Sequence, residues 1–295
     1  MPAPPGSAPG HAAAPTSSGE RMTDISEWTG RVGSAWAEQW RRTDRSFGAL
    51  TDRLLDPAAI GSFHGALDIG CGAGELVARL APAHPAARVT GIDISTELVA
   101  VARTRCSHLA NADFQQCDAA AWAAPQDRRP DLLISRHGVM FFPDPVAAFA
   151  HLRAGAAPAA CLRFSCFRRR EDNGWAVALA SALSAPAAAP DSAAPGPFAF
   201  ADPARVEAIL TAAGWSDIAF EPVDYAMIAG EGEDAVEEAL AYFQRIGPAA
   251  RAIAELPEAE RPAVRARLRA VLASHRVGDQ VAMPSAAWIV TARAR

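Results

Sequence analysis

The stretch Leu67-Asp-Ile-Gly-Cys-Gly-Ala-Gly-Glu-Leu76 decides the fold of this chain. An apolar run over residues 63–69 precedes the glycines and is typical of a strand, and helical spacing begins at Glu75. Glycine is favoured where the backbone turns sharply or approaches a ligand closely, and the start of a helix offers free N–H groups. The order of strand, glycine turn and helix therefore predicts a nucleotide-type loop.

The same alternation of strands and helices continues to residue 167. Further short strands are predicted over residues 88–92, 113–117, 131–135 and 161–167. Ser95 is a predicted N-cap of one intervening helix, and Asp144-Pro145 predicts the start of another. Such alternation favours a doubly wound, mostly parallel sheet, in which ligands bind beyond the carboxyl ends of the strands.

The flanking regions complete the predicted organisation. Residues 1–23 are rich in Pro, Ala, Gly and Ser and predict a disordered tail, whereas the spacing of apolar residues over 25–60 predicts two helices. A helix is expected from Asp202-Pro203 to Gly214, a strand over 217–227, two or three helices over 232–276 and a last strand over 286–292. We therefore expect one folded domain over 24–295, with a helical cap at 24–62, a core at 63–230 and 284–295, and a helical insertion at 231–283.

Composition excludes several classes of function. The 295 residues carry a formal net charge of -5 and no lysine, which argues against a nucleic-acid partner, a lysine Schiff base and a Walker lysine. No window approaches the roughly 18 uncharged apolar residues that a membrane span needs, and the first 20 residues show no secretory pattern. Five cysteines without a C-x-x-C pair or zinc spacing predict reduced thiols and no metal site. The expected location is the cytoplasm.

A second acidic residue tests the interpretation of the glycine loop. Asp93 follows the next predicted strand, 19 residues after Gly74, where a carboxylate can accept hydrogen bonds from ribose hydroxyls. A dinucleotide G-x-G-x-x-G motif that began at Gly70 would place its third glycine at position 75, but Glu75 stands there. The spacing D-x-G-x-G-x-G therefore argues against an NAD(P)-dependent oxidoreductase, which remains an alternative.

At these residues the chain resembles the class I S-adenosylmethionine-dependent methyltransferases. The resemblance implies a Rossmann-like, seven-stranded, partly antiparallel sheet and S-adenosyl-L-methionine as cofactor. Residues 130–145 resemble the fourth-strand segment of the small-molecule branch that includes the ubiquinone and menaquinone biosynthesis enzymes, and residues 28–36 resemble the N-terminal cap of that branch. The expected cofactor-binding residues are Asp68, Gly70, Cys71, Gly72, Gly74, Asp93, Ile94, Asp118, Ala119, Ser135 and Trp36.

Methyl transfer is an in-line displacement at a sulfonium whose positive charge disappears in the transition state, so a dry, aligned pocket supplies much of the rate. His137 follows the fourth strand and is the candidate general base, with a structural role as the alternative. Two roles are open for Arg136: it could bind a substrate carboxylate or pair with an acid on a helix. Likewise Trp28, Trp36 and Trp40 form either core packing or a lid.

The acceptor side carries weaker signals. Arg168-Arg-Arg-Glu-Asp172 follows the fifth strand and would either bind an anionic acceptor or form a solvated charge run, while Pro195-Gly-Pro-Phe-Ala-Phe200 is a candidate to close over the acceptor. The predicted function is methyl transfer to a small-molecule acceptor. Besides the oxidoreductase, a non-catalytic, cofactor-binding partner subunit remains an alternative. The acceptor, the atom methylated and the oligomeric state are left open.

Overall fold

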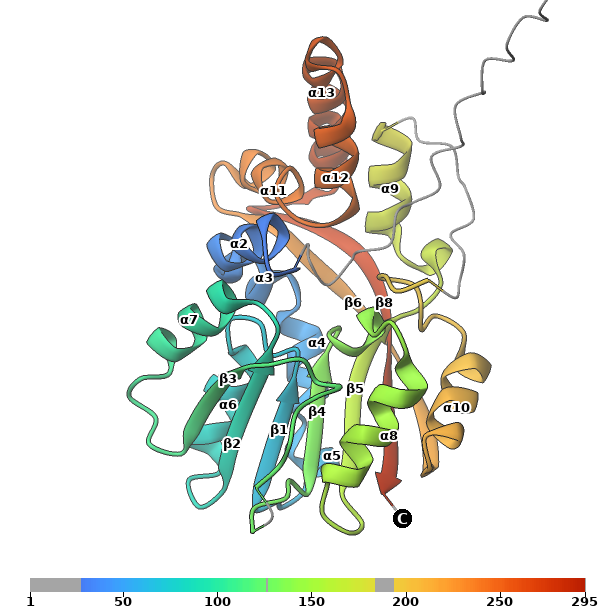
Figure 1. The fold of residues 1–295 in the computed structure, drawn as a ribbon. Helices are drawn as coiled ribbons and strands as arrows, with labels where there is room; N and C mark the ends of the chain where they lie inside the picture. The colour runs from blue at the N-terminus through green and yellow to red at the C-terminus, as the bar shows by residue number, and fades with distance from the viewer. Residues whose placement is uncertain (1–27, 126, 184–193, 295) are drawn as a thin grey trace, which may run out of the picture.

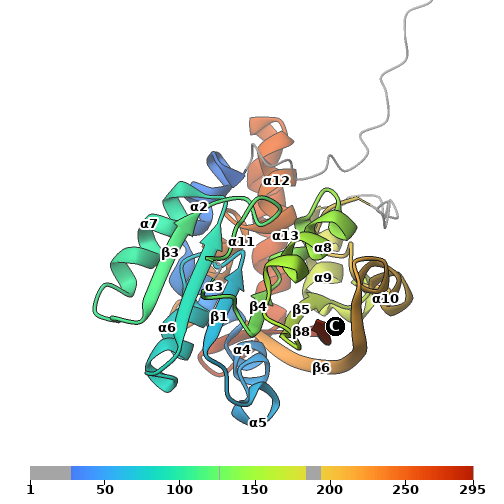
Figure 2. The ribbon, with the colours of Figure 1, turned by 60° about the horizontal axis from the view of Figure 1, so that its bottom comes forward.

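The computed structural model describes residues 28–125, 127–183 and 194–294. The predicted disordered tail at 1–23 and most of the Pro- and Ala-rich stretch at 184–197 lie outside the described residues. Within them, the chain folds around a twisted sheet with helices on both faces: α4 and α6 lie on one side, and α8 and α10 on the other (Figures 1 and 2).

Strands in the order β3-β2-β1-β4-β5-β8-β6 form the sheet, and a two-residue strand β7 pairs with β8. Neighbouring strands from β3 to β5 are parallel, whereas β8 runs antiparallel to both β5 and β6. The Rossmann-like, mostly parallel sheet is therefore confirmed: in the described residues its main path has the seven predicted strands, and the short β7 is an addition. The bounds are β1 Gly65–Ile69, β2 Arg88–Asp93, β3 Ala112–Gln116, β4 Leu132–Arg136, β5 Cys161–Phe167, β6 Trp215–Glu231, β7 Arg276–Val277 and β8 Gln280–Ala294.

Helices between the strands begin where the capping residues predict. The Ser95 side chain accepts a hydrogen bond from Leu98 N at 3.3 Å, and the Asp144 carboxylate accepts one from Ala147 N at 3.0 Å. Such bonds satisfy backbone donors that a helix start leaves unpaired. These helices are α6 Glu75–Ala83, α7 Thr96–Arg105, α8 Pro145–Gly155 and α10 Pro203–Ala212, with 3-10 turns η1 at Val139–Phe141 and η2 at Arg170–Asp172.

The prediction of two N-terminal helices over 25–60 is wrong, because the described part of this region holds four short ones. They are α2 Arg31–Glu38, α3 Trp40–Ser46, α4 Gly48–Leu54 and α5 Pro57–Ile60. Hydrogen bonds from residue i to i-4 continue across the breaks at Gln39 and Phe47, where the backbone leaves helical geometry by one residue. The three- and four-residue apolar spacing therefore persists through the breaks and conceals them.

The C-terminal half differs most from the prediction. Strands β6 and β8 pair over far more residues than predicted, and between them lie α11 Ala235–Phe243, α12 Gly247–Glu255, η3 Glu258–Glu260 and α13 Arg261–Ser274. Pro284 lies inside β8, where proline normally argues against a strand, and the predicted strand begins only after it, at residue 286. Helix α9, Gly174–Leu183, was not predicted and packs against α13.

The surface and the interior divide clearly. Strands β1, β4 and β5 are buried along almost their whole length, as expected for central parallel strands.

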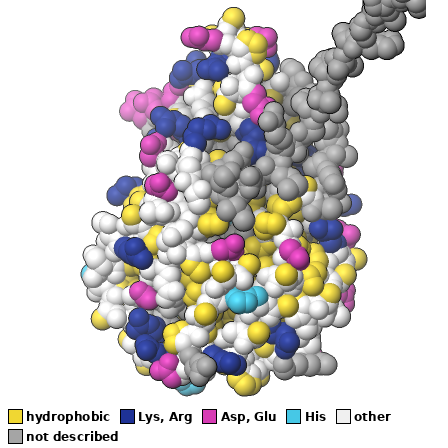
Figure 3. Space-filling view, viewed as in Figure 1, with side chains coloured by type: hydrophobic (Ala, Val, Ile, Leu, Met, Phe, Trp, Pro, Cys, Tyr) yellow, Lys and Arg dark blue, Asp and Glu magenta, His cyan; other side chains and the backbone are white. Residues whose placement is uncertain are grey.

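Charged side chains of both signs gather over the upper part of one face, around α11 to α13, whereas hydrophobic side chains are spread over its lower part around α8 (Figure 3). Among the described residues, no helix is long and apolar enough to cross a membrane.

Candidate active site

The glycine loop connects β1 to α6 at the carboxyl edge of the sheet. Its first glycine, Gly70, has a φ of 67° and lies against Gly138 in the turn after β4, so that a Cβ at Gly70 would come within 3.0 Å of Gly138 Cα. Cys71 N donates a hydrogen bond to Ile92 O at 2.9 Å, which continues the pairing of β1 with β2 into the loop. Close backbone approach therefore explains why glycine stands at position 70.

Asp93 ends β2 and holds the glycine loop in place. One of its carboxylate oxygens accepts a hydrogen bond from Gly72 N at 2.8 Å, and the other accepts one from Ser95 N at 2.9 Å. Burial raises the pKa of this carboxyl, and the backbone donors oppose that rise. Two carboxylate oxygens offer about four acceptor positions, so Asp93 can accept further hydrogen bonds beside the loop. Its neighbour Ile94 is fixed through its carbonyl, which accepts from Gln116 Nε2 at 3.1 Å.

Asp68 lies in β1 directly before the loop and is 1% exposed. Neither of its carboxylate oxygens has a hydrogen-bond partner among the described residues. Burial raises the pKa of this carboxyl to about 8, although the Arg136 guanidinium lowers it in part. A buried, unpaired carboxyl group is costly, and an ammonium group supplied by a ligand would satisfy it.

Asp118 and Ala119 follow β3 and reach the same edge. Cys117 N donates to Asp93 O at 2.9 Å, so the loop after β3 adjoins the end of β2. Asp118 is exposed and caps its own turn by accepting a hydrogen bond from Ala120 N at 2.9 Å, whereas Ala119 is buried. The parallel strands thus bring together Asp68, Asp93 and Asp118, as the sheet topology requires.

Ser135 lies near the end of β4 and is fully buried. Its hydroxyl donates to Ile69 O at 2.6 Å and accepts from Gly138 N at 3.2 Å. Both bonds go to the backbone, so Ser135 holds the turn after β4 against the end of β1. Its direct contact with a cofactor stays a prediction.

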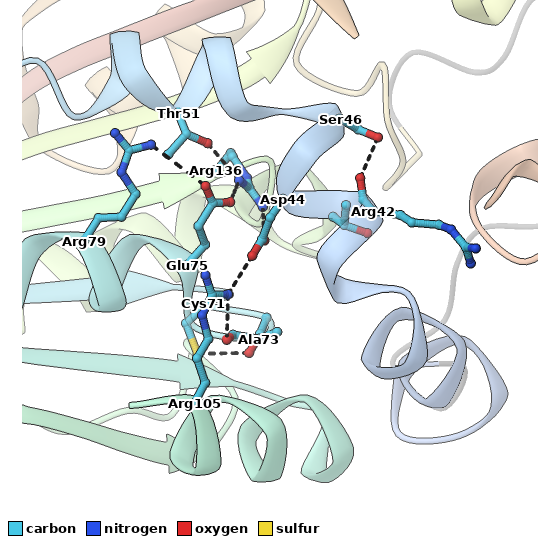
Figure 4. Close-up of polar contacts among 12 residues, drawn as sticks. Arg42, Asp44, Ser46, Thr51, Cys71, Ala73, Glu75, Arg79, Arg105 and Arg136 are labelled. Carbon is cyan, nitrogen blue, oxygen red and sulfur yellow. Dashed lines mark hydrogen bonds and ion pairs between the residues drawn. The ribbon is translucent and has the colours of Figure 1, made fainter. Parts of the chain in front are cut away.

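A network of ion pairs joins the N-terminal cap to the glycine loop (Figure 4). Arg136 bonds to the Glu75 carboxylate and donates to Thr51 Oγ1 at 2.8 Å, with the Asp44 carboxylate 3.6 Å away. Arg105 reaches the other Asp44 oxygen at 2.6 Å and Ala73 O at 3.4 Å. Of the two roles open for Arg136, the structure therefore shows the pairing with an acid on a helix.

Sequence reasoning missed Asp44 and Arg105 because they are 61 residues apart and each looks like an ordinary polar helix position. Burial raises the pKa of Glu75 to about 7, with Arg136 lowering it in part and Asp44 raising it. The network therefore places two acids and the two arginines paired with them beside the glycine loop.

His137 leaves β4 in an unusual backbone conformation, with a φ of 60°. Its ring stacks on Phe167 at 4.0 Å between centroids and 14° between planes, and the Phe47 ring meets its edge at 5.1 Å. The residue is 8% exposed, and neither ring nitrogen has a hydrogen-bond partner in the described part of the chain. Burial and the nearby Arg136 lower the pKa of His137 to about 3, so the imidazole is neutral at pH 7.

Aromatic residues of the cap meet the turn after β4. Trp36 packs on Trp28 at 5.8 Å between centroids, and Trp28 meets the edge of Phe141 at 5.2 Å. A Cβ at Gly33 in α2 would come within 2.5 Å of Ser95 Oγ, so α2 lies directly on the start of α7. The cap therefore covers the end of β2, and Trp36 lies on the cap side of the site.

Charged residues after β5 are paired with one another. Arg168 lies 3.3 Å from Asp172 and 3.0 Å from Asp224, and Arg169 lies 3.7 Å from Asp172. Gly196 N donates to Met140 O at 3.2 Å, which places the described part of the 195–200 segment on the turn after β4. A search of the described residues finds no group of acids, histidines and cysteines that could hold a metal ion.

Comparison with known proteins agrees with this geometry. Residues 66–158 match a family described as "Methyltransferase domain". Trans-aconitate 2-methyltransferase of Variovorax paradoxus is 36% identical over 124 residues, which are 42% of this chain and 46% of that protein. The match thus spans less than half the length of this relative.

Two solved structures share the fold at low identity. Phosphoethanolamine N-methyltransferase 2 of Haemonchus contortus, in complex with S-adenosyl-L-methionine, has a TM-score of 0.53 at 15% identity, covering 93% of this chain and 61% of that one. The (4+2)-cyclase SpnF has a TM-score of 0.52 at 18% identity, covering 89% and 94%. The strand order and the glycine loop therefore give this chain the fold of these two structures, and residues 66–158 are similar to the methyltransferase domain family.

Proposed function

We propose that this protein is an S-adenosylmethionine-dependent methyltransferase that acts on a small-molecule acceptor. The observation that carries the proposal is the Asp68 carboxyl group, buried without a partner directly before the glycine loop. The methionine part of S-adenosylmethionine carries an ammonium group that fits this need. A relative named as a methyltransferase and a solved neighbour in complex with S-adenosyl-L-methionine support the same ligand.

Each part of the proposed ligand has a matching group in the site. Asp68 would bind the ammonium group, Asp93 the ribose hydroxyls, and Asp118 with Ala119 the adenine. Backbone groups of Gly70, Cys71, Gly72 and Gly74 would line the methionine side, with Ile94 beside the ribose and Trp36 above it. The bound ligand supplies a methyl group on a sulfonium, and the protein aligns the acceptor with it.

His137 would orient the acceptor as a neutral imidazole. A ring whose pKa is about 3 holds a proton weakly, so the general-base role that the sequence suggested receives no support from its surroundings. Its two unpartnered nitrogens can still donate and accept hydrogen bonds. In-line transfer from a sulfonium needs alignment first, and we assign that task to His137.

Two finer points stay predictions. The resemblance of residues 130–145 to the ubiquinone and menaquinone biosynthesis enzymes is one, because the relatives found carry a different name, trans-aconitate 2-methyltransferase. The cytoplasmic location is the other. The alignment covers less than half of the first relative, so its acceptor does not carry over to this chain.

Isothermal titration of the purified protein with S-adenosylmethionine, S-adenosylhomocysteine and NADH tests the proposal. We expect micromolar binding of the two adenosyl ligands and no heat from NADH. Binding of NADH alone would favour the oxidoreductase alternative and refute the proposal. Binding of S-adenosylmethionine without turnover of any acceptor, measured as release of S-adenosylhomocysteine, would favour the non-catalytic partner subunit.

A further inference from the structure

His137 lies in the turn after β4, beside the glycine loop. The next residue, Gly138, touches Gly70 of that loop, and His137 N donates to Ser165 O on β5 at 3.1 Å. Ser165 is fully buried, and its hydroxyl has no hydrogen-bond partner among the described residues. Unpartnered polar atoms directly after β4 and in β5 therefore lie at the same end of the sheet as the loop, and buried polar groups in native proteins normally have partners.

Flat, apolar aromatic rings surround these polar atoms. Phe47 and Phe167 flank the His137 ring, and Phe167 in turn packs on Trp175 at 5.3 Å and Phe198 at 5.9 Å. The rings come from the cap, β5, α9 and the segment after residue 194, which are far apart in sequence. Aromatic rings pack best on other flat rings, in stacked or edge-on arrangements.

The charges nearby disfavour an anion. The two arginines that approach the loop, Arg105 and Arg136, are already paired with Asp44 and Glu75. The arginines after β5 are engaged as well: Arg168 and Arg169 pair with acids, and Arg170 packs over the Phe198 ring at 5.0 Å. An acceptor carboxylate in this region would need a cation as its partner, but the arginines there are already engaged.

We infer that the acceptor is an uncharged molecule with a flat ring and a hydroxyl group that hydrogen-bonds to the His137 imidazole. This inference rests on the proposed function. In the reaction, a lone pair of the hydroxyl oxygen forms the new C–O bond, the C–S bond breaks with its electron pair remaining on sulfur, and the hydroxyl proton passes to solvent water. His137 is then a specificity-determining residue, and carboxylate-rich acceptors are rejected.

A matched pair of acceptor analogues tests the expected charge and the flat ring of the acceptor. The protein is first loaded with S-adenosylhomocysteine, and this titration alone reports on the proposed function. The loaded protein is then titrated with 2-naphthol and with 2-naphthoate, which share the ring and differ in charge at pH 7. We expect 2-naphthol to bind at least about tenfold more tightly, the scale of one hydrogen bond or one unpaired charge. Tighter or equal binding of 2-naphthoate, or no binding of 2-naphthol, overturns the inference while the proposed function stands.

A variant pair tests His137 itself. His137→Phe keeps a flat ring against Phe167 and removes two buried, unpartnered nitrogens, so Tm is expected to stay the same or rise, whereas 2-naphthol affinity falls about tenfold. His151→Phe is the control, because His151 lies on α8 and its Nε2 bonds to Trp122 O at 2.6 Å. Affinity for S-adenosylhomocysteine should be unchanged in both. Unaltered 2-naphthol affinity in His137→Phe would remove His137 from acceptor recognition.

Discussion

The two halves of the site are built in different ways. On the cofactor side, the contacts are made largely through backbone groups at the ends of neighbouring strands: Asp93 binds the N–H groups of Gly72, in the loop after β1, and of Ser95, two residues away. On the acceptor side, side chains from distant segments meet, as Phe47, His137 and Phe167 do. The first half therefore depends on how neighbouring strands pair, and the second on how the cap packs onto the sheet.

Crowding the backbone of the cofactor side should have the largest effect. A Cβ on Gly138 would come within 2.6 Å of Ile69 O and 3.1 Å of Gly70 Cα, both backbone atoms that cannot move aside easily. We expect Gly138→Ala to weaken S-adenosylmethionine binding by about a hundredfold and to lower stability by about 1–3 kcal/mol, the usual cost of overpacking. Calorimetry and thermal melting measure both.

The matched control is Gly155→Ala at the end of α8, where the added Cβ would meet its nearest neighbour at 3.7 Å. It should change neither quantity appreciably. Equal effects of the two substitutions would show that the contact of Gly138 with the glycine loop has no special importance.

Removing the unpaired carboxyl group should have the next largest effect. Asp68→Asn keeps the shape of the side chain but cannot form the carboxylate that a bound ammonium group would stabilise, so S-adenosylmethionine affinity should fall by about 1.5–3 kcal/mol, the scale of a charge-assisted hydrogen bond. An unchanged dissociation constant would show that Asp68 does not bind the ammonium group and would weaken the case for the cofactor.

The same residue predicts a pH dependence. The pKa of Asp68 is about 8 in the folded protein and about 4 in the unfolded chain, so the folded state binds more protons between these values. Stability therefore falls as pH rises from about 4 to about 8, by up to about 1.4 kcal/mol per pH unit from this group. Denaturant unfolding at several pH values should show a smaller slope for Asp68→Asn than for the wild type. Parallel slopes would contradict the assigned pKa.

Loosening the cap should have the smallest effect on binding. Asp44 joins the cap to Arg105 and Arg136, whereas Asp52 on the same cap pairs with Arg79 at 2.7 Å and is largely exposed. We expect Asp44→Asn to weaken S-adenosylmethionine binding by about 1 kcal/mol, because partly buried charge pairs contribute more than exposed ones, and Asp52→Asn to leave it unchanged. Equal losses, measured by calorimetry, would indicate a general effect of cap charge.

The contrast between the halves also explains what could be predicted from sequence. Gly70 has a positive φ, and Asp93 binds backbone N–H groups of the glycine loop and of Ser95. These backbone requirements restrict which residues can stand at the two positions, so their spacing indicates the fold and the cofactor side. The partner of Arg136 could not be chosen, since Glu75 and Asp44 meet it only after three elements pack. The unpartnered state of the His137 nitrogens likewise depends on Phe47 and Phe167, which no local pattern connects to it.

The long pairing of β6 with β8 creates a site where the segment between the two strands can be replaced. Glu231 at the end of β6 lies opposite Gln280 at the start of β8, and Gly232 N donates to Asp279 O at 2.8 Å. Whatever chain is inserted between these positions leaves and re-enters the sheet at one place. Helices α11 to α13 can therefore be lengthened, shortened or replaced during evolution without moving the strands that carry the glycine loop. New acceptor preferences could arise there while methyl-donor chemistry is inherited intact.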